Sequence, residues 1–252
     1  MNQLHARPFT LFLLAASVSF TLACDVKVDD KGFALNLGRS EATDEWTRTY
    51  QLSAGGQLEI VNTNGLIEAT GSDGPSVEVR AERKARAASE PEAVDLLKKL
   101  DMGEQVSATR VRIEAKDDDA SIQYHVRVPG GVSVSFRTAN GGIRIQNVNG
   151  QITAATTNGG VQADLSSLSG DVTLATTNGG VRIDLPPNVK ANLDAACVNG
   201  GIDIDDEFKV DTGSDDSRCR VSAALNGGGP RISAATVNGG IRIRARGGRQ
   251  TD

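Results

Sequence analysis

Histidine, the side chain that most often serves as a general base, is scarce in this chain. Only His5 and His125 occur in its 252 residues. His5 lies in an amino-terminal segment that we predict to be removed on export. His125 falls between Tyr124 and Val126 in an alternating pattern that points it outward, as at a solvated strand position. Because a Ser–His–Asp or Cys–His constellation has no obvious members, we expect no catalytic residues and no cofactor.

Carboxylates offer two further kinds of chemistry. Asp184, Asp203 and Asp205 would form a row on one outer face, as in the grooves of β-helix polysaccharide lyases and hydrolases. Alternating charge on exposed strands explains the same row without catalysis, so an enzyme of that class is our third hypothesis. Acidic residues that offer oxygen ligands for calcium also gather near one insertion: Asp203, Asp205, Asp206, Glu207, Asp211, Asp215 and Asp216.

This acidic insertion lacks the spacing of known calcium loops. Neither the EF-hand pattern nor the Gly-Gly-x-Gly-x-Asp repeat of calcium-binding rolls occurs in the chain. We therefore predict a solvated acidic segment over residues 205–217 and no metal site.

An internal repeat dominates the second half of the chain. Asn-Gly-Gly is followed by an apolar residue and then by strict alternation, with a period of about twenty residues that fits two strands and two corners. Asn-Gly tolerates positive φ, which suits a corner. We expect the asparagines to stack as a hydrogen-bond ladder rather than to contact a ligand. The predicted structural corners are Asn140 and Gly141, Asn158 and Gly159, Asn178 and Gly179, Asn199 and Gly200, and Asn238 and Gly239.

The amino terminus reads as an export signal. Phe9 to Phe20 form an apolar run after a weakly basic start, and the run is shorter than the ~20 residues of a membrane span. Thr21-Leu22-Ala23-Cys24 resembles a bacterial lipobox, although Thr21 stands where Leu is preferred. We predict that residues 1–23 are a signal peptide and that Cys24 is acylated. The alternative is a secreted protein without lipid.

Two further cysteines, Cys197 and Cys219, remain after Cys24. An even number in an exported chain favours a disulfide, which would close a loop of roughly twenty residues and contribute ~3 kcal/mol in the chain-entropy view. The alternative is two independent small core residues.

The intervening patterns define the remaining elements. Residues 24–45 are polar and are predicted to be a tether, with a short strand within it as the alternative to an unbroken tether; order is expected to begin near Trp46, with one β-strand-repeat domain over residues 46–252. Ser89-Glu90-Pro91 is a helix start, and Gly103 follows a face of spaced apolar residues. We expect one short helix near residues 90–101, lying on a sheet.

The number of strands constrains the fold class. More than ten strands with one apolar face need a cover that one short helix cannot supply, so the sheet must fold against itself. Asn-Gly turns alone also fit an antiparallel sandwich, and local pattern does not separate the two. Small inward residues favour the narrow interior of a β-solenoid, in which two sheets lie ~10 Å apart. The expected class is all-β, an elongated solenoid.

Composition excludes one class of partner and suits a thin core. The formal net charge is −5 with no basic cluster, so we expect no nucleic-acid binding. Aromatic residues make up 4% of the chain, which leaves few large side chains for a core.

Residues 46–252 resemble the bacterial putative-adhesin family of β-strand-repeat proteins, a domain of unknown function. The resemblance lies in Gln57 to Ile67, in the central helix, and in Val126 to Pro129 leading into the repeats. It implies an elongated β-solenoid outside the cytoplasm and brings no catalytic residues.

Together these features predict a non-enzymatic exported envelope protein, a scaffold or adhesin-like binding module attached to the membrane by a lipid anchor. It would face the periplasm or the cell surface. Its exposed strand faces would contact a polysaccharide or another envelope protein. The alternative is an extracytoplasmic signalling or envelope-stress partner that docks on a membrane protein. The end of the last coil, near Ile241 and Ile243, is predicted to be an open edge that can pair with another copy.

Overall fold

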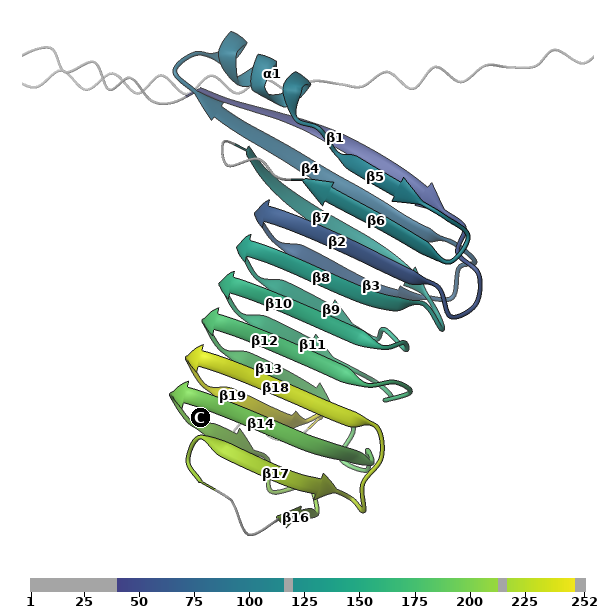
Figure 1. The fold of residues 1–252 in the computed structure, drawn as a ribbon, viewed down its shortest axis with the longest axis vertical. Helices are drawn as coiled ribbons and strands as arrows, with labels where there is room; N and C mark the ends of the chain where they lie inside the picture. Colours follow the sequence, from purple (N-terminus) through teal and green to yellow (C-terminus); the bar gives the residue numbers. More distant parts are fainter. Residues whose placement is uncertain (1–39, 116–119, 213–216, 248–252) are drawn as a thin grey trace, which may run out of the picture. The chain divides into compact units, whose positions relative to one another are not determined.

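The computed structural model describes residues 40–115, 120–212 and 217–247. They belong to one compact unit, Arg39–Asp252. Two sheets of nine and ten strands face each other across this unit, and one helix, α1 (Glu90–Lys99), lies at one end of the stack (Figure 1). Within the described residues, no helix is long and apolar enough to cross a membrane.

Each sheet is a ladder whose order differs from the order in the sequence. Sheet 1 contains, from one edge to the other, β1 (Ser40–Tyr50), β4 (Val77–Ala87), β7 (Ala120–Pro129), β3 (Ile67–Ser72), β9 (Ile143–Gln146), β11 (Val161–Asp164), β13 (Val181–Leu185), β19 (Ile241–Ala245) and β15 (Ile202–Ile204). Sheet 2 contains β16 (Val210–Thr212), β17 (Arg220–Leu225), β14 (Ala191–Asn199), β18 (Arg231–Asn238), β12 (Val172–Asn178), β10 (Ile152–Asn158), β8 (Ser133–Asn140), β2 (Gln57–Asn64), β6 (Arg110–Ala115) and β5 (Gly103–Val106).

The central strands form the predicted solenoid. Each coil contributes one strand to each sheet, and neighbouring coils pair in parallel, so that Val161 lies opposite Ile143 on one side and Val181 on the other. A chain of Asn-Gly hairpins would have produced antiparallel pairs instead. The two-strand coil with a period of about twenty residues is therefore confirmed, and the antiparallel sandwich is excluded for this region.

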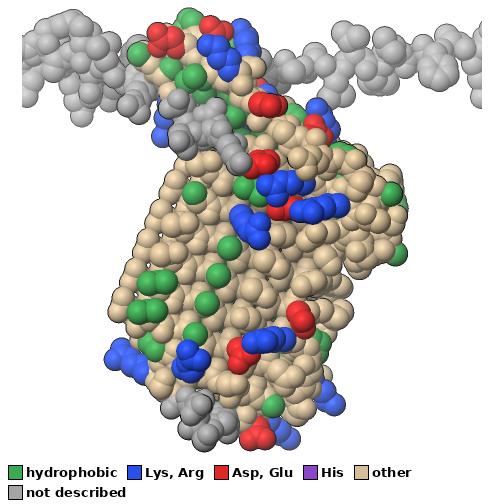
Figure 2. Space-filling model, viewed as in Figure 1, with side chains coloured by type: hydrophobic (Ala, Val, Ile, Leu, Met, Phe, Trp, Pro, Cys, Tyr) green, Lys and Arg blue, Asp and Glu red, His purple; other side chains and the backbone are tan. Residues whose placement is uncertain are grey.

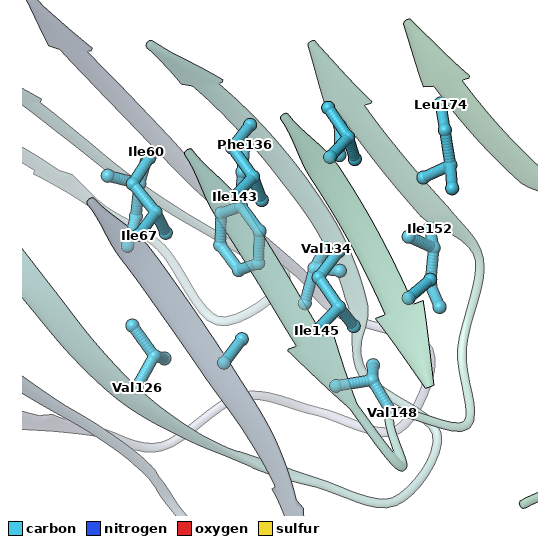
Figure 3. Packing of buried hydrophobic residues seen from close by; sticks show 14 of the residues in the cluster. Ile60, Ile67, Val126, Val134, Phe136, Ile143, Ile145, Val148, Ile152 and Leu174 are labelled. Carbon is cyan, nitrogen blue, oxygen red and sulfur yellow. The ribbon is translucent and has the colours of Figure 1, made fainter. Parts of the chain in front are cut away.

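The core is the narrow space between the two sheets. Strands alternate buried and exposed positions, as in β9, where Ile143 and Ile145 are fully buried and the residues between and after them are exposed. Side chains from the two sheets meet in this space (Figure 3). Phe136 and Tyr124 are the largest fully buried side chains, and most others are Ile, Val, Leu or Ala. Burying each Leu or Ile contributes about 1.5–3 kcal/mol, so many small contributions stabilise the stack.

The last coil is not an open edge, and this prediction is wrong. β18 lies between β12 and β14, and β19 lies between β13 and β15. Ile241 and Ile243 consequently have paired strands on both sides and are fully buried. The segment between β15 and β18, which includes the antiparallel β17, gives the chain enough length to return past β14. In the described part of the chain, the outermost strands are β1, β15, β5 and β16.

The first ordered strand begins at Ser40, earlier than the predicted onset near Trp46. β1 pairs along its whole length with β4 in antiparallel register, which places Glu41 opposite Arg86 and Asp44 opposite Arg83. Glu41 contacts Lys84 and Arg86, and Asp44 contacts Arg83. Cross-strand charge pairs thus stabilise a segment whose polarity suggested a tether. The rest of that segment, residues 24–39, lies outside the described residues.

The predicted helix is confirmed as α1, which contacts β1 and β4. Pro91 stands in its first turn, and Lys98 and Lys99 lie near its C-terminus. Ala93 and Leu97 are buried on the face toward the sheet.

Candidate functional site

The asparagines of the predicted corners form a continuous ladder along the stack. From Asn140 onward, each side-chain amide donates a hydrogen bond to the side-chain oxygen of the asparagine one coil nearer to Asn64, at 2.8–2.9 Å, and the Asn64 amide donates to the Ala120 carbonyl oxygen. Along the stack the ladder runs through Asn64, Asn140, Asn158, Asn178, Asn238 and Asn199. Because every amide in this run is used by a neighbouring coil, the ladder has a structural role.

The glycine after each of these asparagines is required by the close approach of neighbouring coils. A Cβ on Gly159, whose φ is +153°, would lie 2.1 Å from the carbonyl oxygen of Gly141. Gly141, Gly179 and Gly239 are in equivalent positions, and a Cβ on Gly200 would lie 1.8 Å from the Gly239 carbonyl oxygen. The corner therefore excludes every side chain.

Threonines on the inner side of the corner complete its hydrogen bonds. The hydroxyls of Thr156, Thr176 and Thr236 each donate to a glycine carbonyl of the adjacent coil at 2.8 Å. Cys197 occupies the equivalent position in β14, opposite Thr236. A disulfide joins Cys197 to Cys219, and their two Cα atoms are 4.7 Å apart. The predicted acylation site, Cys24, lies outside the described residues.

The residues considered for catalysis or metal binding do not form one cluster, and each has its own separate partners. His125 has its Nδ1 3.1 Å from Glu68 and is about one third exposed. Asp203 pairs with Arg244, and Asp184 receives bidentate hydrogen bonds from Arg182.

Asp205 binds backbone N–H groups of Glu207 and Ala245 rather than joining Asp203 in a site. Asp215 and Asp216 lie outside the described residues. Among the residues that the structure describes, no three His, Cys, Asp or Glu side chains are grouped to hold a metal ion.

The outer face of sheet 2 carries an uncharged central surface, which we call the hydroxyl face. Register brings one row of hydroxyls into line, and a second row of alanines runs beside it. Figure 2 shows this side of the molecule, with charged side chains gathered at either end of an uncharged stretch. The first row comprises Thr153, Thr173 and Ser233, and it continues to Ser135, which is buried; the second comprises Ala155, Ala175, Ala235 and Ala196.

One end of the hydroxyl face is an arginine cluster around Glu59. Glu59 points outward from β2, yet its side chain is only 4% exposed because arginines from both neighbouring strands cover it. Arg110 and Arg112 of β6 donate hydrogen bonds to its two oxygens, and Arg137 of β8 lies 3.5 Å from Oε1. Arg112 also donates to Glu114 at 3.0 Å. Three guanidinium groups thus share one buried carboxylate.

The arginine cluster changes the acidity of Glu59. Burial alone would raise the pKa of this carboxyl group, but hydrogen bonds from Arg110 and Arg112 outweigh burial and hold the pKa below its ordinary value of 4.5. Glu59 is therefore ionised over the physiological range.

A shallow hollow of about 430 Å³ opens beside the cluster, with Arg110 and Arg112 in its wall. Its remaining lining is Gln105, Val106 and Ser107, from β5 and the turn after it. The hollow and the guanidinium groups together provide a place where an external group can be contacted.

Alternation with the buried Val111 and Ile113 places Arg110 and Arg112 on the outward face of their strand, but it does not group them with Glu59 or Arg137. Glu59 is far in sequence from Arg112 and from Arg137. These residues become neighbours only because the coil formed by β2 and β3 stacks between the coil that contains β6 and the coil that contains β8. Alternation shows which face a residue occupies and does not show which coils are neighbours.

The first prediction concerns the corner glycines. Gly159→Ala should lower the free energy of unfolding by about 3 kcal/mol or more, because the methyl group meets the Gly141 carbonyl and φ is strained. Gly160→Ala is the matched control. Its Cβ would lie 3.4 Å from the nearest atom, so we expect a change under about 1 kcal/mol. Urea unfolding measures both, and equal losses would contradict the close-approach argument.

The second prediction concerns Glu59 and pH. Glu59→Gln should cost about 2 kcal/mol of stability at neutral pH, because charged hydrogen bonds to the arginines are lost. Since the pKa is depressed in the folded state, this contribution is present above pH 4.5 and lost as pH falls through the folded pKa. Urea unfolding from pH 7 to about 2.5 should show the wild-type advantage shrinking.

The control for this prediction is Glu78→Gln. Glu78 is half exposed and lies 3.9 Å from its arginine, so its change should stay within about 0.5 kcal/mol at every pH. If the difference in unfolding free energy between the wild type and Glu59→Gln is constant across the pH range, the lowered pKa of Glu59 is refuted.

Comparison with solved structures supports the fold. The chain is similar to a putative cell adhesion protein from Clostridium sporogenes, with a TM-score of 0.58, 12% identity and coverage of 81% of this chain and 100% of that one. A putative adhesin from Bacteroides fragilis matches with a TM-score of 0.32, 14% identity and coverage of 81% and 97%. At these identities, the first match shows a shared fold and the second carries no argument.

A search of curated proteins gives no match. The family model of the Toastrack DUF4097 domain matches residues 102–244, from the strand after the helix to the last coil. This region is more than half of the chain and contains all five predicted corners, so the chain belongs to the Toastrack DUF4097 family.

Proposed function

We propose that this chain is a non-enzymatic binding module of the cell envelope and that the hydroxyl face of sheet 2 contacts a polysaccharide. The observation that supports the proposal is the regular surface itself. Solvent-accessible hydroxyl groups repeat across β10, β12 and β18 at the ~4.8 Å spacing of a sheet, and no charge interrupts them. A polymer with its own repeating hydroxyls can bind such a surface at several equivalent positions.

The chemistry of the face fits saccharide hydroxyls. Serine and threonine hydroxyls both donate and accept hydrogen bonds, as sugar hydroxyls do. The small alanine side chains beside them project little from the sheet, so a saccharide chain can lie against the strands. Rigid strands also position the hydroxyls with little loss of side-chain entropy on binding.

Export and lipidation are part of the same proposal. Residues 1–23 would direct export, and acylation of Cys24 would tether the unit beginning near Ser40 to a membrane. The polar segment between them would act as a spacer. A scaffold or adhesin-like role follows from this placement.

The third prediction tests the hydroxyl face. Thr153→Glu with Thr173→Glu should abolish recovery of polymer when the protein is isolated from crosslinked envelopes, because two longer, negatively charged side chains replace hydroxyls in the path of the polymer. Gln162→Glu, at an exposed position on β11 in sheet 1, should leave recovery unchanged. Polymer content of the isolated complex is measured directly.

Two outcomes would refute this function. Recovery of one stoichiometric membrane protein without polymer would favour the alternative, an extracytoplasmic signalling or envelope-stress partner. Equal recovery by all variants would exclude the hydroxyl face as the contact surface.

The fourth prediction tests the anchor. A clickable fatty acid should label the wild-type protein and should fail to label Cys24→Ser, since Cys24 supplies the acylated atom. The readout is in-gel fluorescence of the isolated protein. Absence of label on the wild type, or label that survives the substitution, would exclude lipidation at this residue.

A further inference from the structure

We propose that Arg110, Arg112 and Arg137, held in place by Glu59, form a subsite for a carboxylate group of an acidic polysaccharide. This inference rests on the proposed function and adds the charge of the polymer and the place where that charge is bound. The subsite lies at the end of the hydroxyl face, so one saccharide chain can contact both surfaces.

The charge of the cluster favours an anion. On the outward positions of β5, β6, β2, β8 and β10, the charged residues are three arginines and two glutamates, Glu59 and Glu114. Three positive and two negative charges leave one positive charge in excess. Because one of the two carboxylates is almost completely buried, the solvent meets mainly guanidinium groups.

The hydrogen-bond capacity of the cluster is far from exhausted. A guanidinium group has five N–H donors, whereas a carboxylate offers about four acceptor sites. Glu59 receives one hydrogen bond each from Arg110 and Arg112. The side chains of Arg110 and Arg137 are 55% and 56% exposed, so donors on both reach solvent.

Glu59 acts as a positioning residue. It fixes guanidinium groups that would otherwise sample many rotamers, and a fixed fork loses less entropy when it binds an external carboxylate. Arginine pairs with carboxylates in bidentate geometry, which selects a planar anionic group over a neutral hydroxyl. The adjoining hollow of about 430 Å³ offers space for the sugar ring that bears this group.

The experiment is calorimetric titration of the purified full chain with oligogalacturonate at low salt. We expect binding by the wild type and a loss of about tenfold or more in Arg137→Gln, the size expected when hydrogen bonds to a charged group are removed. Affinity should also fall as salt is raised, because the exposed charges are screened.

Arg144→Gln is the matched control. Arg144 is 57% exposed, also pairs with a glutamate, Glu68, and lies on the opposite sheet, so its substitution should leave affinity unchanged. Urea unfolding of both variants checks that the fold is retained, since neither side chain is buried.

The other outcomes decide against the subsite. Equal affinity of Arg137→Gln and wild type, or no binding of oligogalacturonate by the wild type, overturns it. Displacement of oligogalacturonate by an equal concentration of inorganic phosphate overturns the saccharide assignment in favour of a free oxyanion. If Arg137→Gln recovers envelope polymer as well as wild type does, the subsite is wrong and the proposed function stands. If wild type recovers no polymer, the proposed function fails whatever the titration shows.

Discussion

The close approach of neighbouring coils at the Asn-Gly corner is the constraint on which the rest of the structure depends. At Gly159 the backbone of one coil lies so near the Gly141 carbonyl that no side chain fits. The asparagine ladder and the inward threonines then satisfy the polar groups of the same corner. A coil can therefore stack in one register only, and every strand that leaves a corner inherits that register.

Because the register is fixed, equivalent residues of successive coils line up in rows. These rows determine which chemical groups the outer faces present to a ligand. On sheet 2 the outward positions of β10, β12 and β18 align into one row of hydroxyls and one row of alanines. On sheet 1 the equivalent rows hold ion pairs such as Arg182 with Asp184 and Arg144 with Glu68. The two faces of one repeating backbone thus differ in chemistry, because substitutions at outward positions leave the corner and core untouched.

Sequence patterning predicted the local structure well and the order of the coils poorly. The period, the corners and the helix at Glu90–Lys99 follow from Asn-Gly, alternation and capping, which are local signals. The position of β19 between β13 and β15 does not follow from these local signals, because its inward isoleucines would fit equally well at an end of the stack. The start of β1 at Ser40 was missed for a related reason, since its charges are stabilised by distant partners on β4.

The Glu59 cluster shows how the order of coils can create chemistry that no local segment contains. β2 comes first in sequence among the three strands, but its outward glutamate is covered only when β6 and β8 pair on either side of it. Until both have paired, Glu59 faces water and the arginines are not held together. The cluster is thus a property of the completed stack, and a binding surface that includes it exists only in the fully folded protein.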